Sequence, residues 1–171
     1  MAANKYIALV SGKLKEVIAT VVSTGVSEAN KIVALDSTGK LDVSVMPSGV
    51  SAEVIVVATS ENLTAGQFVN LYDNGGTITA RKADATTNAK PAHGFVLDST
   101  TSPANATVYF ESQQNSALTS LTVGADYYLS TTPGGVTSTP PSSAGNIVQY
   151  IGRATSATNL PFIPCDTIEI A

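Results

Sequence analysis

The sequence has no tryptophan and only one histidine and one cysteine among its 171 residues. Cys165 alone cannot form a disulfide within the chain or a thiolate metal cluster. Because its neighbours in LPFIPCDTIEI are mostly apolar, we predict that Cys165 is a buried structural thiol. His93 alone cannot build a multi-histidine metal site in one chain. We predict a structural or simply exposed role for it, ahead of a strand.

Recognisable catalytic parts are also lacking. The sequence has no G-x-S-x-G nucleophile elbow and no glycine-rich oxyanion loop. Acids near predicted strand ends, such as Asp73, Asp98, Glu111 and Asp126, are typical of turns and solvated positions. The absence of tryptophan weakens a sugar-binding platform, although several tyrosines are present. We therefore expect no enzymatic activity, no catalytic residue, no metal ligand and no cofactor.

Charged residues make up 13% of the chain, which is about half the usual fraction of ~25%. The net charge of −4 and the scattered basic residues exclude the dense Lys and Arg clusters that nucleic-acid binding needs. No apolar run approaches the roughly 20 residues that span a bilayer, and MAANKYIALVSGK lacks the pattern of a secretory signal. We expect a soluble protein made in the cytosol, with neither nucleic acid nor membrane as a partner.

What the chain does have is a series of short runs rich in β-branched residues, separated by Gly, Ser, Asn and Pro. Turn signals recur about every eight to twelve residues, a spacing typical of sandwiches and barrels. The pattern predicts an all-β fold, with a single helical turn within residues 23–31. Runs that read as strands include KYIALV, EVIATVVS, KIVALD, AEVIVVAT, QFVNLYD, TITARKA, AHGFVLD, ATVYFES, DYYLST and NIVQYIGRAT.

Two hairpin turns are explicit in the sequence. YDNGGTIT carries Asn74, Gly75 and Gly76, and LSTTPGGVTST carries Pro133, Gly134 and Gly135. Glycine and asparagine tolerate the positive φ angles of tight turns. We predict that these residues form outer loops that could contact a partner.

The composition changes near residue 50, after MPSGV. This change predicts an extended N-terminal arm, residues 1–50, followed by a compact β-sandwich or barrel-like domain, residues 51–171. The arm has short apolar strands and few aromatic residues, so we predict that it does not bury a core of its own. We predict that it pairs with a neighbouring protein instead. The predicted partner-binding residues are Tyr6, Ile7, Leu9, Val10, Ile32, Val33, Leu35 and Leu41.

The stretch DSTGKLDVSVMPSG, residues 36–49, resembles a ligand-binding loop at first sight. A phosphate loop requires an earlier glycine and a Ser or Thr after Gly39-Lys40, but Leu41 stands there. An EF-hand loop requires more oxygen ligands and a closing Glu. The sequence therefore predicts a turn between two strands, in which Asp36 accepts backbone hydrogen bonds and Gly39 supplies the permissive φ.

The order of these segments resembles that of small virion structural proteins of tailed bacteriophages. The resemblance covers nearly the whole chain: KIVALDSTGKLDVSVMPSGV, LTAGQFVNLYDNGGTITARKADATTNAKPAHGFV, ATVYFE and LTVGADYYLSTTPGGVTSTPPSSAGNIVQYIGRATSATNLPF. Its strongest part runs from Leu63 to Phe162. Related segments occur on heads, as decoration or cement proteins, and on tail fibres or other tail parts.

This resemblance implies a β-rich, non-enzymatic subunit that forms homotrimers. On the leading interpretation it is a capsid decoration protein that binds the major capsid protein on the exterior of the head, after synthesis in the host cytoplasm. The arm is longer than in the well-known small head-stabilising proteins, so their binding mode does not transfer directly. The alternative is a tail or fibre component that contacts host glycans or other tail proteins.

Overall fold

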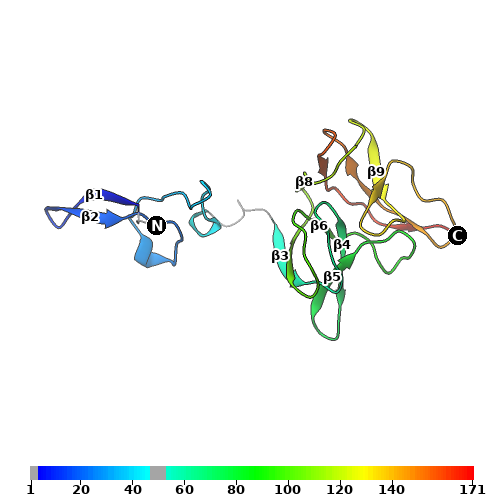
Figure 1. Ribbon diagram of the computed structural model, residues 1–171, viewed down its shortest axis with the longest axis horizontal. Helices are drawn as coiled ribbons and strands as arrows, with labels where there is room; N and C mark the ends of the chain where they lie inside the picture. The colour runs from blue at the N-terminus through cyan, green and yellow to red at the C-terminus, as the bar shows by residue number, and fades with distance from the viewer. Residues whose placement is uncertain (1–3, 47–52) are drawn as a thin grey trace. The chain divides into compact units, whose positions relative to one another are not determined.

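The computed structural model describes residues 4–46 and 53–171 and consists of two compact units, residues 1–51 and 52–171 (Figure 1). We call them the N-terminal unit and the β domain. Within the described residues, the only helical segments are two short 3₁₀ turns, η1 (Val26–Glu28) and η2 (Val43–Val45). The prediction of an all-β fold is confirmed, and η1 lies where a helical turn was expected.

The N-terminal unit is built on one antiparallel hairpin, β1 (Lys5–Val10) and β2 (Lys13–Ile18). Ser11 and Gly12 form its turn, both with positive φ. The strands that we predicted on either side of the turn at residues 36–40 are wrong. KIVALD contributes only a single bridge between Val33 and Thr20, and residues 43–45 form η2. A strand needs a neighbour along its length, and KIVALD has only Thr20 beside it.

The β domain begins with a five-stranded antiparallel sheet, in the order β3-β7-β6-β4-β5. Its first and last strands meet at one end, where Thr59 bridges Ala80 and Ser60 N–H donates to the carbonyl of Ala80 (3.0 Å). The sheet therefore closes into a barrel-like shape, which removes part of its free edge. The strands are β3 (Val54–Ala58), β4 (Phe68–Asp73), β5 (Ile78–Lys82), β6 (Gly94–Val96) and β7 (Asn105–Tyr109).

The centre of this sheet, β6 and the first three residues of β4, is buried on both faces, whereas Val54, Val56 and Ile78 of the outer strands are exposed. Adjacent residues of one strand join different clusters: Val69 joins the cluster on the inner face, whereas the preceding Phe68 joins the larger cluster on the outer face. Val96 and Phe95 divide in the same way. Because successive side chains point to opposite faces, the centre of the sheet contributes to two cores.

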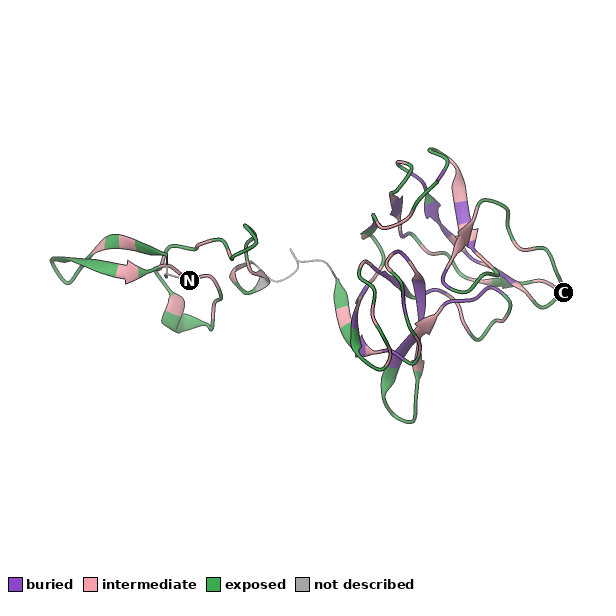
Figure 2. Cartoon of the chain, in the orientation of Figure 1, coloured by how far each residue is buried: buried purple, intermediate pink, exposed green. Residues whose placement is uncertain are grey.

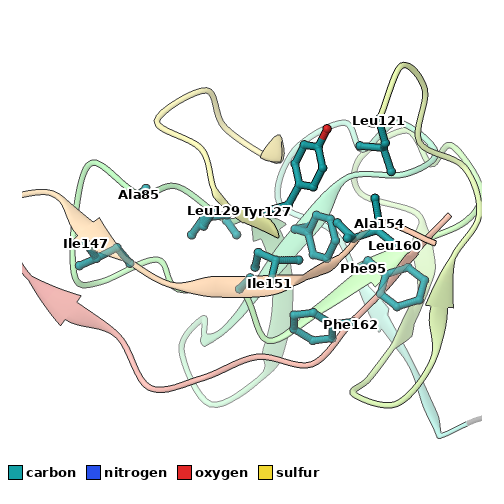
Figure 3. Close-up of a cluster of buried hydrophobic side chains, with 13 residues drawn as sticks. Ala85, Phe95, Leu121, Tyr127, Leu129, Ile147, Ile151, Ala154, Leu160 and Phe162 are labelled. Atoms are coloured by element: carbon teal, nitrogen blue, oxygen red, sulfur yellow. The ribbon is translucent and has the colours of Figure 1, made fainter. Parts of the chain in front are cut away.

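Aromatic side chains form the centre of the larger cluster, where the C-terminal segments cover the sheet (Figure 3). The ring of Phe162 packs against Phe68 and Phe95, with centroids 5.5 Å and 6.2 Å apart. Phe95 also stacks on Tyr109 at 5.5 Å. Tilted and edge-to-face rings at these distances are favourable beyond the area that they bury. The C-terminal half is therefore fixed to the sheet by aromatic packing.

The C-terminal half consists of short ladders, and buried polar side chains bond it to the segments that precede β4 and β6. Gln149 pairs with the backbone of Ala92, accepting from its N–H (2.7 Å) and donating to its carbonyl (2.9 Å). The fully buried Asn115 donates to the carbonyl of Gly66 (2.8 Å). The strands are β8 (Gln114–Asn115), β9 (Asp126–Leu129), β10 (Val136–Thr137), β11 (Ile147–Val148), β12 (Tyr150–Arg153), β13 (Leu160–Pro161) and β14 (Ile168–Glu169).

Both cores consist of β-domain residues, from Val57 to Phe162. We therefore expect that deletion of residues 1–51 leaves a domain that unfolds cooperatively, with a Tm within about 3 °C of that of the full chain, a shift that corresponds to less than ~1 kcal/mol. Differential scanning calorimetry of both chains checks this expectation. A truncated chain without a cooperative transition would show that the β domain depends on the N-terminal unit.

Candidate interaction surfaces

Exposed aliphatic side chains are concentrated in the N-terminal unit. Among the residues of this unit whose side chains are described, Thr20 alone is buried, whereas buried segments run throughout the β domain (Figure 2). A unit that buries so little apolar surface has little to offset its loss of conformational entropy. Its apolar residues are therefore available to another protein. They are Ile7, Leu9, Val10, Leu14, Ile18, Val22, Val26, Ile32, Val33, Leu35, Leu41 and Met46.

One face of the β1–β2 hairpin carries the most regular part of this surface. Residues that face each other across an antiparallel pair lie on the same side of the hairpin, and alternate residues share a face. The register therefore places six residues together, which we call the outer hairpin face: Lys5, Ile7, Leu9, Leu14, Glu16 and Ile18. Its four aliphatic side chains are between 55% and 76% exposed.

The opposite face of the hairpin is directed to the rest of the unit. Tyr6, Ala8 and Val17 are half-buried there. The Tyr6 hydroxyl accepts a hydrogen bond from the backbone N–H of Ile32 (3.3 Å). Tyr6 therefore positions the segment around Ile32, and it does not share a surface with Ile7 and Leu9.

The predicted set of partner-binding residues thus lies on more than one surface. Ile7 and Leu9 belong to the outer hairpin face, whereas Tyr6 and Val10 lie on the other face. Leu14 and Ile18 were missed by the sequence interpretation. Their spacing was the signal that could have identified them, because residues four apart in a strand lie on the same face.

Four further predicted residues, which we call the loop aliphatics, lie outside the hairpin and are all exposed: Ile32, Val33, Leu35 and Leu41. Backbone bonds to Thr20 fix this segment: Thr20 N–H donates to the Ile32 carbonyl (2.9 Å), and Ala34 N–H donates to the Thr20 carbonyl (2.8 Å). The Thr20 hydroxyl also donates to the Glu28 carboxylate (2.7 Å). Hydrogen bonds, and not a core, therefore hold the part of the loop that carries Ile32 and Val33 in place, with both side chains exposed.

A carboxylate organises each of two turns in this unit. Asp36 Oδ1 accepts from the N–H groups of Thr38 (2.8 Å) and Lys40 (3.0 Å), and Gly39 has a φ of 78°. The turn predicted here is confirmed, and these donors, led by Lys40 N–H, lower the pKa of Asp36. The pKa of Glu28 is lowered in the same manner, mainly by its hydrogen bond with Lys31 (2.8 Å).

The two predicted outer loops of the β domain differ in character. Asn74, Gly75 and Gly76 are exposed at the tip of the β4–β5 hairpin. In the β9–β10 loop, Pro133 is exposed but Gly134 is buried. Gly134 N–H donates to the carbonyl of Ala83 (2.7 Å), and its own carbonyl accepts from Phe68 N–H (2.9 Å). The second loop is therefore anchored to the sheet, and only its tip is free for contact.

His93 has a structural role. Its ring nitrogen Nδ1 accepts the N–H of Leu71 (3.0 Å) and lies 3.4 Å from the amide nitrogen of Asn70. Asn70 in turn accepts from Arg81 (2.9 Å), whose guanidinium lies 4.2 Å from the ring centre of Tyr72. Burial of part of the ring lowers the pKa of His93, and the nearby Arg81 cation lowers it further. The neutral imidazole is thus the form that the fold holds.

Asp126 and Cys165, two further residues considered for a chemical role, show no arrangement with a catalytic partner among the contacts of the described residues. Asp126 accepts from Arg153 (2.8 Å and 3.1 Å), and this bond lowers the pKa of the Asp126 carboxyl. Cys165 is exposed, so the prediction of a buried thiol is wrong. Its backbone N–H donates to the carbonyl of Tyr150 (3.4 Å), and its side chain is exposed to solvent.

An open, uncharged pocket of about 370 Å³ lies in the β domain. Gly66, Gln67, Leu118, Tyr127 and Val136 are among its lining residues, and the Tyr127 hydroxyl already accepts the N–H of Thr122 (2.8 Å). In residues 4–46 and 53–171, no cluster of three or more His, Cys, Asp or Glu side chains is suited to hold a metal ion. Over the same residues, no helix has the length and apolarity needed to cross a bilayer.

The low pKa of His93 makes stability depend on pH. The unfolded chain takes up a proton near the ordinary pKa of 6.5, whereas the folded protein does so only at lower pH. The free energy of unfolding therefore falls as the pH falls through 6.5, and this contribution levels off below the folded pKa. We expect a lower Tm at about pH 5.5 than at about pH 7.5, with a smaller drop in His93→Gln. Equal drops in both proteins would contradict this assignment.

Comparison with known proteins identified no relative of this chain. No protein-family model matches the sequence, and no curated protein matches it.

Proposed function

We propose that this chain is a structural protein of a tailed bacteriophage virion, namely a capsid decoration or cement protein. It is made in the host cytoplasm and binds the lattice of the major capsid protein on the exterior of the head. The observation that carries the proposal is the contrast between the two units. The β domain has two cores of its own, whereas the N-terminal unit exposes its aliphatic residues. This arrangement is expected of a stably folded domain that is joined to a segment for attachment to another protein.

The proposed mechanism is mechanical and involves no catalytic residue or cofactor. Packed DNA pushes the shell subunits outward, and a clamp that bridges neighbouring subunits raises the free energy needed to separate them. The loop aliphatics would be buried against the capsid protein, and each fully buried aliphatic side chain would contribute about 1.5–3 kcal/mol. In a homotrimer, which the resemblance supports, three attachment segments act together, so that moderate contacts give strong binding.

A second candidate function is that of a tail or fibre component that contacts host glycans or other tail proteins. The exposed tip of the β4–β5 hairpin, with Asn74, Gly75 and Gly76, favours this possibility because loop tips commonly carry recognition residues. Specific glycan binding by the isolated protein would support it. Binding to heads that lack the protein would count against it.

A pair of matched substitutions tests the attachment surface. Ile32 is 56% exposed among the loop aliphatics, and Ser37 is exposed in the neighbouring turn. Ile32→Asp removes apolar contact area and forces a carboxylate into the interface, so we expect about ten-fold weaker binding to heads that lack the protein, or a greater loss. Ser37→Asp adds the same charge without removing an aliphatic group, and its binding should stay within about two-fold of the unmodified chain.

Quantitative co-sedimentation of the full-length chains with purified heads gives the two affinities. Circular dichroism should first show that both variants retain the strand content of the β domain. If Ile32→Asp binds as tightly as Ser37→Asp, the loop aliphatics are not the attachment surface.

A further inference from the structure

The outer hairpin face is apolar but also electrically balanced. Lys5 and Glu16, its only charged residues, form an ion pair diagonally across the two strands. Lys13 and Lys15 of β2 lie on the opposite side of the hairpin, because their register partners are Val10 and Ala8. The outer hairpin face therefore presents four aliphatic side chains together with one base and one acid.

This balance restricts what can cover the face. A strongly acidic partner surface would be opposed by Glu16, and a strongly basic one by Lys5. The identical face of a second copy presents the same aliphatic groups and one charge of each sign. In a two-fold arrangement, Lys5 of each copy can approach Glu16 of the other, as expected for a self-complementary interface.

We propose that the outer hairpin face is a self-association surface, on which the same face of a second copy of this chain packs. This inference goes beyond the proposed function, because it assigns a contact between copies to the hairpin, separate from the proposed homotrimer, and does not require a capsid. The loop aliphatics would remain available to bind the capsid protein.

The size of the face determines how strong this association is. Four aliphatic side chains are far fewer than the roughly 20–30 residues per side of a standard interface. Free chains should therefore associate weakly and reversibly, with a mass that rises with concentration. Copies held close together, as on a common lattice, would associate more completely through their high effective concentration.

Sedimentation velocity of the full chain over a range of concentrations tests the proposal. The truncated chain, residues 52–171, gives the baseline number of copies per particle, which the β domain alone sets. We expect the full chain to contain more copies per particle than this baseline as the concentration increases, and Leu14→Asp to weaken that association at least ten-fold. Val26→Asp is the matched control: Val26 is 92% exposed in the same unit but lies outside the hairpin.

A charge exchange tests contact between copies even if Leu14→Asp perturbs the hairpin itself. Lys5→Glu gives a face with two acids, and Glu16→Lys gives a face with two bases. Each variant alone should keep the baseline number of copies per particle because like charges meet, whereas an equimolar mixture should associate again. Restoration upon mixing requires that residues of different copies meet, so a purely intramolecular role of the ion pair cannot produce it.

Three results would overturn the proposal. The full chain could keep the baseline number of copies per particle at every concentration. Val26→Asp could abolish association as completely as Leu14→Asp does. The mixture of charge variants could fail to associate although the unmodified chain does.

Discussion

The burial of apolar surface is the constraint on which this protein depends, and its two units meet it differently. In the β domain, the centre of one sheet is covered on both faces, so that Phe68 and Val69 enter different cores from adjacent positions. Phe162 then fixes the C-terminal segments to the outer face. The N-terminal unit follows the same period of two in its hairpin, but the aliphatic side chains of the outer hairpin face remain exposed among the described residues of the unit.

This difference links the fold to the proposed function. A domain with a complete core can project from a virion without support, whereas a hairpin with outward aliphatic groups gains stability when another protein covers it. Backbone contacts to Thr20 and the Asp36 turn keep the loop aliphatics outward without a core. Association of copies through the hairpin and attachment of the loops to a capsid would together bury what the isolated chain exposes.

The parts of the fold that depend on local sequence were predictable. KYIALV corresponds to β1 over its full length, and the Asn-Gly-Gly sequence correctly predicted the β4–β5 turn, because strand propensity and turn geometry are local properties. Contacts between distant segments were not predictable, among them the closure of the sheet through Thr59 and Ala80. The orientation of Cys165 was also wrongly predicted, because an apolar segment does not reveal which of its side chains point inward. For the same reason, the four partner-binding residues that were predicted in β1 are divided between the two faces of the hairpin.

Immunogold labelling of intact virions with an antibody against the β domain tests most directly whether this chain coats a phage head. The same antibody should also be tested on separated heads and tails. We expect label distributed over the head faces and on isolated heads, because the β domain would project outward from an attached N-terminal unit. Label confined to the tail would contradict the assignment to the capsid and favour a role in contact with the host.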